Sequence, residues 1–157
     1  MITRMNVCLG GTFYPLHKGH KALLRKAFQI AGPKGSVFIG VTSASMTKKK
    51  KEIASFEKRK QSIEHFLAEE NVIGQAIIQQ LSNKFGPTLK GDFDAIIVSP
   101  ETQPTAEEIN RKLKFLEKKP FQIIVIPFVL SKDGKPISSS RIRRKEIDEN
   151  GIILKQE

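Results

Sequence analysis

The sequence predicts an α/β fold in which a five-stranded parallel sheet carries helices on both faces, within a single domain over residues 1–157. Short apolar runs alternate along the chain with stretches whose apolar residues recur every three or four positions, as in parallel α/β proteins. Four of the runs, NVCL, VFIGV, AIIV and IIVI, are continuously apolar, which is typical of strands buried on both faces. The length of 157 residues and the 39% hydrophobic content suit one domain with its own core and exclude a disordered chain.

These four runs and a fifth, AIIQQL, predict the strands. The strands are expected at Asn6–Leu9, Ser36–Val41, Ala76–Leu81, Ala95–Ser99 and Ile123–Pro127.

Helical periodicity predicts two long helices in the first half of the chain. One extends from about Lys18 to Ala31 and ends at Gly32-Pro33. The other extends from about Phe56 to Glu69, and its buried stripe is formed by Ile63, Phe66 and Leu67.

Two further helices are expected in the second half. A capping box at residues 105–108, Thr-Ala-Glu-Glu, opens a helix that continues to about Lys118. Three serines at residues 138–140 cap a short helix that reaches Glu146.

The charge balance points to an anionic ligand. Lys and Arg number 27 against 16 Asp and Glu, a net charge of +11, which attracts nucleic acid, anionic membranes or phosphorylated small molecules. Cys8 is the one cysteine, so an internal disulfide is excluded and a reducing compartment is expected. No run approaches the roughly 18 to 20 apolar residues of a membrane span, and no signal-peptide stretch precedes the first glycines. The protein is therefore expected to be cytoplasmic, with no membrane partner.

In a doubly wound, Rossmann-like sheet, ligands bind beyond the carboxyl ends of the strands, where the strand order reverses. The chemistry is therefore expected in the four segments that follow strands. These are Gly10–His20, Thr42–Lys51, Ser99–Thr102 and Pro127–Arg143.

The first of these segments reads GGTFYPLHKGH. Its glycines allow close approach to a bound group, and Thr12 offers a hydroxyl near the start of a helix, whose amides and dipole favour an anion. His17 and His20 are three residues apart and share one face if both are helical, and Gly19 leaves room for a phosphate or base. Two imidazoles beside such a gap suit nucleotidyl transfer, although histidines at this spacing also bind metals or simply pack in a core.

The pattern GTFYPLHKGH resembles the signature of the nucleotidylyltransferases with an H-x-G-H motif, whose fold is similar to the catalytic domain of class I aminoacyl-tRNA synthetases. The resemblance implies an ATP site at Gly10, Gly11, Thr12 and Phe13, with His17 and His20 as catalytic residues. It implies that His20 stabilises the α-phosphate in the transition state. Tyr14 departs from the family, which usually has Asp at this position.

A second motif, KPISSSRIR at residues 135–143, combines hydroxyls, a helix start and arginines into another anion site. Arg141, Arg143 and Arg144 all lie on this helix, and a solvated basic helix is the alternative interpretation. The motif resembles the family's I-S-S-[ST]-x-x-R sequence. The resemblance assigns the β- and γ-phosphates to Ser138, Ser139, Ser140 and Arg143.

The other strand exits supply further candidates. The run Met46-Thr-Lys-Lys-Lys-Lys51 follows a segment similar to the family's T-S-x-x-M, and one lysine, Lys50 or else Lys48, is predicted to reach the phosphates. Such a basic loop closes over reactants and excludes water. Ser99 and Glu101, in VSPET, are predicted to contact ATP, with Glu101 orienting a ribose or the acceptor.

Three further segments, FGPTL, SPET and INR, are similar to the archaeal form of phosphopantetheine adenylyltransferase. This resemblance implies transfer of the adenylyl group of ATP to 4′-phosphopantetheine, giving dephospho-CoA and pyrophosphate in coenzyme A biosynthesis. Mg²⁺ is expected as an ion bridged by the substrate phosphates, with no metal site made by the protein alone.

Three alternatives remain open. The first keeps the chemistry with nicotinamide mononucleotide, FMN or glycerol phosphate as the acceptor. The second is a basic nucleic-acid-binding protein, which the absence of Trp and the single Tyr disfavour. The third is an inactive scaffold, and the oligomeric state is open in every case.

Overall fold

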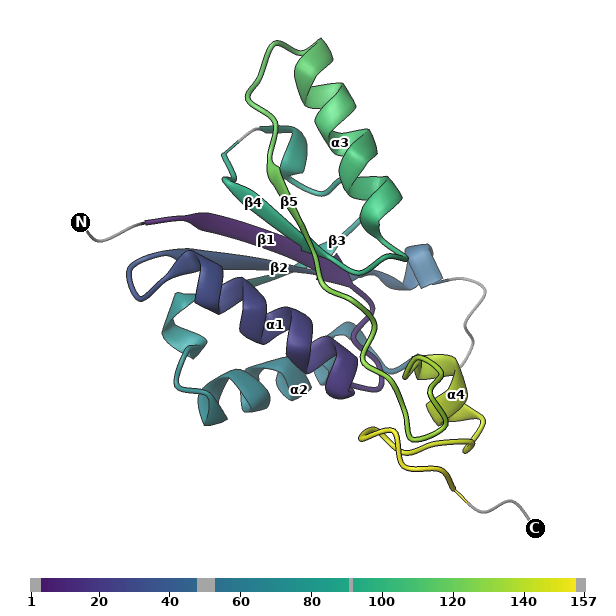
Figure 1. The fold of residues 1–157 in the computed structure, drawn as a ribbon. Coiled ribbons are helices and arrows are strands. Elements are labelled where there is room, and N and C mark those ends of the chain that lie inside the picture. Colours follow the sequence, from purple (N-terminus) through teal and green to yellow (C-terminus); the bar gives the residue numbers. More distant parts are fainter. Residues whose placement is uncertain (1–3, 48–52, 91, 155–157) are drawn as a thin grey trace.

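The computed structural model of the chain describes residues 4–47, 53–90 and 92–154. Five parallel strands form one sheet in the order β3-β2-β1-β4-β5 (Figure 1). The strands are β1 Asn6–Gly11, β2 Ser36–Thr42, β3 Ala76–Leu81, β4 Ala95–Val98 and β5 Gln122–Val125. The predicted α/β fold with a five-stranded parallel sheet is confirmed, and the strand order reverses between β1 and β4.

Among the described residues, three α-helices and three short 3₁₀ turns connect the strands, and a fourth α-helix follows β5. The helices are α1 Lys18–Ala31, α2 Phe56–Glu69, α3 Gln103–Phe115 and α4 Ser139–Arg143. The 3₁₀ turns are η1 Ala44–Thr47, η2 Ile73–Gln75 and η3 Thr88–Lys90.

Helices cover both faces of the sheet, α1 and α2 on one and α3 on the other (Figure 1). Successive strand residues point to opposite faces, so Val7 and Leu9 pack with α1 and α2 while Cys8 packs with α3. The continuously apolar strands are explained by these two cores. α4 lies beyond the carboxyl ends of the strands, beside the start of α1 (Figure 1).

Three helix boundaries differ from the prediction. α3 begins at Gln103 because Thr102 is the N-cap and Pro104 lies in the first turn, where its missing N–H is not needed. The predicted capping box at residues 105–108 therefore lies inside the helix. α3 ends at Phe115, before Glu117 with its positive φ of 58°, and α4 ends at Arg143, before Lys145 with a φ of 62°.

The prediction of a fully buried fifth strand was wrong. β5 pairs only with β4 and forms an edge of the sheet, so Gln122 and Val125 are exposed. A continuous apolar run does not distinguish a central strand from an edge strand. Within the described ranges, the helices include none whose length and apolar character would suffice to cross a membrane.

Candidate active site

A cavity of about 510 Å³ opens at the carboxyl ends of β1 and β4, where the strand order reverses. This volume lies within the roughly 300–1,000 Å³ of small-molecule sites. It is lined by every predicted site residue that the structure describes: Gly10, Gly11, Thr12, Phe13, His17, His20, Ser99, Glu101, Ser138, Ser139, Ser140 and Arg143. Lys48 and Lys50 lie outside the described residues. The cavity, called the polar cavity below, thus unites segments from both ends of the chain.

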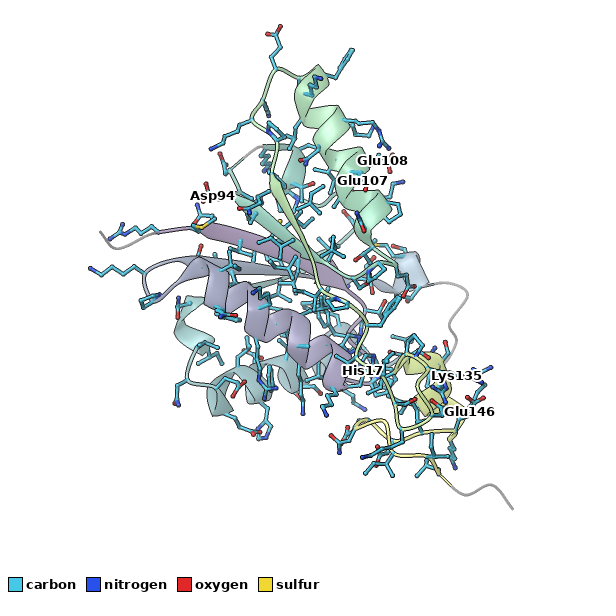
Figure 2. All side chains as sticks on the ribbon, viewed as in Figure 1. His17, Asp94, Glu107, Glu108, Lys135 and Glu146 are labelled. Atoms are coloured by element: carbon cyan, nitrogen blue, oxygen red, sulfur yellow. The ribbon has the colours of Figure 1, made fainter. Side chains whose placement is uncertain are left out.

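The two histidines meet through the cap of α1. His17 is the N-cap with an extended backbone, and its Nδ1 accepts hydrogen bonds from the N–H groups of Gly19 at 3.0 Å and His20 at 3.4 Å. In return, the Nδ1 of His20 accepts from the N–H of His17 at 3.2 Å. The rings stack with centroids 3.7 Å apart. His17 is therefore not helical, and the expected shared helical face is replaced by a reciprocal capping box. Figure 2 shows His17 at the end of α1 that faces the C-terminal segment.

Burial sets the charge state of both rings, and the hydrogen bonds to Nδ1 set their tautomer. Burial lowers the pKa of His17 to about 4, and burial together with the neighbouring His17 lowers the pKa of His20 to about 3. Both imidazoles are neutral at pH 7, and a neutral ring whose Nδ1 accepts carries its proton on Nε2. Each ring therefore brings no positive charge to the cavity at this pH, and a hydrogen bond to the backbone of Pro15 offsets part of the lowering of the His20 pKa.

The packing of the His17 ring against the first turn of α1 requires a glycine at position 19. A Cβ at this position would lie 2.8 Å from Cε1 and 3.0 Å from Nδ1 of His17. Gly19 also lines the polar cavity, so the expectation that it leaves room for a phosphate or base stays a prediction. The glycine lets the His17 ring fold back onto the first turn of α1.

The amides at the start of α1 are not free for an anion, contrary to expectation. The N–H of Lys18 donates to the carbonyl of Glu149 at 3.0 Å, and the next two N–H groups donate to His17. Donors for a phosphate at this end of the cavity are therefore side chains such as the hydroxyl of Thr12 and the two imidazoles.

The serine-rich turn closes the opposite side of the polar cavity. Ser138 is the N-cap of α4, and its hydroxyl accepts from the N–H of Arg141 at 3.2 Å. Arg143 lines the cavity, and its Nη1 donates to the carbonyl of Tyr14 at 3.2 Å. This bond ties α4 to the loop that carries Thr12.

Only one of the three arginines in this motif faces the cavity. Arg141 pairs with Asp133 at 2.5 Å and with Glu146 at 3.1 Å, and Arg144 pairs with Glu146 at 3.3 Å. The expectation that all three contribute to an anion site was wrong, because carboxylates on neighbouring turns neutralise two of them.

Tyr14 lies at a different surface from the predicted ATP contacts. It lines a shallow hollow beside Lys21, Lys58 and His65, on the side of α1 and α2. Its backbone carbonyl, and not its side chain, contacts Arg143. The departure from the family's Asp therefore does not alter the lining of the polar cavity.

A second cavity of about 180 Å³, called the apolar cavity below, lies on the α3 face of the sheet. Its apolar lining includes Cys8, Phe38, Leu81, Phe85, Ile96 and Ile109. It shares Leu9, Gly10, Gly11, Thr42, Ile97 and Thr102 with the polar cavity, so the two meet at the ends of β1, β2 and β4. Nothing in the sequence pointed to this cavity, because its lining residues are spread over most elements of the fold and form no local motif.

Cys8 is buried in this lining, and burial raises the pKa of its thiol to about 12. A thiol in this state is a poor nucleophile. The cavity therefore offers contacts to a ligand and no covalent chemistry of its own.

Arg59 is a buried residue near the site that sequence reasoning overlooked. It lies on the buried stripe of α2 with Ile63, Phe66 and Leu67. The sequence offered one signal for this residue: Arg59 lies four residues before Ile63 and therefore on the same, apolar face of the helix. Its guanidinium contacts Thr12 and Thr42.

Comparison with known proteins gives a consistent result. Residues 8–145 match the family described as cytidylyltransferase-like. The chain is 43% identical over 151 residues to a phosphopantetheine adenylyltransferase of Methanosarcina acetivorans, covering 96% of each chain. A relative from Archaeoglobus fulgidus with the same name is 38% identical, covering 96% of this chain and all of the other.

Solved structures agree on the fold. An Archaeoglobus fulgidus protein of unknown function has a TM-score of 0.71 at 35% identity, covering 78% of this chain and 89% of that one. The expected likeness to class I synthetases is visible in the fold alone. A tyrosyl-tRNA synthetase of the same organism gives a TM-score of 0.63 at 12% identity, with 88% of this chain and 59% of that one covered. With the H-x-G-H and serine-rich motifs at one cavity and these near full-length relatives, the chain belongs to the phosphopantetheine adenylyltransferases of the cytidylyltransferase-like family.

Proposed function

We propose that the protein transfers the adenylyl group of ATP to 4′-phosphopantetheine, forming dephospho-CoA and pyrophosphate in coenzyme A biosynthesis. One observation carries this proposal: a polar cavity with the nucleotidyl-transfer motifs joins an apolar cavity at the ends of β1, β2 and β4. ATP occupies the polar cavity, and the aliphatic arm of the acceptor occupies the apolar one. The reacting phosphates then meet at the shared boundary near Thr42.

The reaction is a direct displacement. A phosphate oxygen of the acceptor attacks the α-phosphorus of ATP, and the bond from that phosphorus to the β-phosphate bridge breaks. The electron pair of that bond leaves on pyrophosphate. Because two anions approach each other, catalysis consists of positioning and of stabilising the charge on the phosphates.

The histidine pair supplies neutral donors at the α-phosphate. With Nδ1 of both rings held by backbone N–H groups, the Nε2–H bonds are fixed in direction before the substrate arrives. Fixed donors need no reorganisation as charge develops in the transition state. We assign this role chiefly to His20, with His17 holding the ring by stacking.

The leaving pyrophosphate is held at the other side of the cavity. The hydroxyls of Ser138, Ser139 and Ser140 and the guanidinium of Arg143 are the donors there. Lys48 and Lys50 remain proposed phosphate ligands. Ser99 and Glu101 line the same cavity beside Thr102 and are proposed to contact the nucleoside.

The apolar cavity suits the pantetheine arm of the acceptor. It is narrow and lined largely by hydrocarbon, and the hydroxyls of Thr88, Thr102 and Thr105 and the amine of Lys84 are polar groups available to amides along that arm. A bulky, polar acceptor such as nicotinamide mononucleotide or FMN fits this lining less well. The cavity therefore supports 4′-phosphopantetheine over the other acceptors.

Magnesium fits the site only as a companion of the triphosphate. Across residues 4–47, 53–90 and 92–154, no group of three or more His, Cys, Asp or Glu side chains is placed to hold a metal. The ion's ligands there would be oxygens of the triphosphate and water, beside the carboxylate of Glu101 in the cavity lining. When bound, the ion would neutralise charge on the phosphate oxygens.

The test is an assay with ATP, Mg²⁺ and 4′-phosphopantetheine, with mass analysis for dephospho-CoA. The same reaction is run with nicotinamide mononucleotide, FMN or glycerol phosphate, the last also with CTP, and pyrophosphate release is measured. We expect product with 4′-phosphopantetheine and release near background with the others. Turnover with another acceptor alone, or no turnover at all, would contradict the proposal.

A further inference from the structure

Arg59 is a buried cation that touches neither substrate cavity. Its side chain is 2% exposed on the buried stripe of α2, and it is absent from the lining of both cavities. Its Nε donates to the carbonyl of Ala54 at 2.9 Å. Burying a guanidinium costs free energy unless hydrogen bonds compensate, so the other acceptors that Arg59 contacts must be identified.

Those contacts lead to Thr12 of the polar cavity by two routes. The Nη1 of Arg59 donates to the carbonyl of Thr12 at 3.2 Å and to the Oγ1 of Thr42 at 3.2 Å. The hydroxyl of Thr42 in turn donates to the Oγ1 of Thr12 at 3.1 Å. Three residues from α2, β2 and the loop after β1 thus form one directed chain of hydrogen bonds.

The direction of this chain fixes where the proton of Thr12 points. A hydroxyl has one proton and two lone pairs, and Arg59 is a donor only. Thr42 accepts from Arg59 and gives its proton to Thr12. Thr12 therefore accepts from Thr42, and no residue among those described accepts from its O–H, which can donate to a ligand in the cavity that it lines.

The second contact orients the backbone next to Thr12. A trans peptide directs its C=O and N–H to opposite sides. Anchoring the carbonyl of Thr12 on Arg59 therefore turns the N–H of Phe13 away from the guanidinium. Phe13 has a positive φ of 53° and is buried at the wall of the polar cavity, so the anchored carbonyl stabilises an otherwise unfavourable backbone.

We propose that Arg59 is a positioning residue which, through Thr42, aims the hydroxyl of Thr12 at the phosphates of ATP. The inference rests on the proposed function only in taking ATP as the ligand. Each link is a hydrogen bond between side chains of described residues, and the last link is a donor that already lines the site. Losing a hydrogen bond to a charged ligand weakens binding by about 10- to 100-fold.

The test is a double-mutant cycle on the dissociation constant of MgATP, measured by calorimetry. Thr42→Val removes the link with little change in shape, and Thr42→Ser is the matched variant that keeps the hydroxyl. We expect Thr42→Val to weaken MgATP binding about 10- to 100-fold and Thr42→Ser to bind within about threefold of the parent. Arg59→Lys removes the Nε donor to Ala54 and places its amine one bond closer to the backbone than Nη1, so it is expected to weaken binding as well.

The proposal is tested by the energetic coupling between substitutions at Arg59, Thr42 and Thr12. Arg59→Lys is expected to add little in the Thr42→Val background, and Thr42→Val to add little to Thr12→Val. Melting temperatures measured without ligand show whether each variant is folded. If Arg59→Lys does not fold, the test rests on the coupling between Thr42→Val and Thr12→Val. Full additivity of the effects, or unchanged affinity in Thr42→Val, would overturn the proposal. Failure of the parent protein to bind MgATP would instead contradict the proposed function.

Discussion

The imidazole rings of His17 and His20 stack with centroids 3.7 Å apart, and the Nδ1 of each accepts a hydrogen bond from the backbone N–H of the other residue. The helix cap and the proposed catalytic donors are therefore the same two side chains. Substitutions at this pair are therefore expected to change turnover and the free energy of unfolding by different amounts.

Replacing His20 by Ala removes the proposed donor at the α-phosphate. We expect turnover to fall about 10²- to 10³-fold, the usual effect of losing one preorganised donor. The matched control is His65→Ala, because His65 is an exposed histidine on α2 whose partner is Glu69. Steady-state assays on both variants, with circular dichroism to confirm folding, make the comparison. Near-normal turnover in folded His20→Ala would contradict the assignment.

Gly19→Ala is expected to lower activity with little loss of stability. The new Cβ would lie 2.8 Å from the His17 ring, so the ring must move and the stacked pair is disturbed. Alanine also favours a helix over glycine by about 1 kcal/mol, which offsets part of the strain in the folded protein. Gly74→Ala is the control, because nothing lies within 4 Å of its added Cβ. Equal turnover of the two variants would show that the His17 ring position does not matter.

The histidine pair makes stability depend on pH. The pKa of His17 is lowered to about 4 and that of His20 to about 3 in the folded chain, against about 6.5 in the unfolded chain. The unfolded state therefore binds more protons below pH 6.5, and stability is full above this pH and is lost as the pH falls toward 4. Urea unfolding at pH 7.5 and pH 5 is expected to differ by on the order of 2 kcal/mol for each histidine.

The control for this effect is a variant with Asn at positions 17 and 20. Its unfolding free energy is expected to change less between the two pH values than that of the parent. An identical pH dependence in the two proteins would show that these imidazoles are not the titrating groups.

Arg143→Met is expected to raise the KM for ATP about 10- to 100-fold, because a charged donor to the leaving phosphates is lost. The adjacent Arg144 provides the control, since its side chain is largely exposed and pairs with Glu146 at 3.3 Å. Arg144→Met is expected to stay within about twofold of the parent, as surface ion pairs contribute little. Equal effects in both variants would point to general charge rather than to a specific site.

Phe85→Ala is expected to weaken binding of the acceptor without weakening binding of ATP. Phe85 lines the apolar cavity and not the polar one, and burial of an aromatic side chain contributes about 1.5–3 kcal/mol. The KM for 4′-phosphopantetheine is therefore expected to rise about tenfold or more. Phe115→Ala is the matched control, because Phe115 is 88% exposed at the end of α3. If only the KM for ATP rose, the acceptor would not bind in the apolar cavity.

The sequence predicted the elements, and which segments meet at one cavity, better than it predicted the contacts within that cavity. Strand exits and motif order placed Thr12 and Ser139 in one site, because carboxyl ends of parallel strands gather at one edge of the sheet. Linear spacing did not reveal that His17 caps α1 with its own ring. It also did not separate Arg143 from Arg141, since the partners of an arginine depend on how distant turns fold together.

The most direct test of the account is a crystal structure of the protein with Mg²⁺ and a non-reactive ATP analogue. The account predicts that the Nε2 of His20 and the hydroxyl of Ser139 both lie within hydrogen-bond distance of the same triphosphate. A triphosphate bound by only one of these two residues, or outside the cavity that they share, would contradict it.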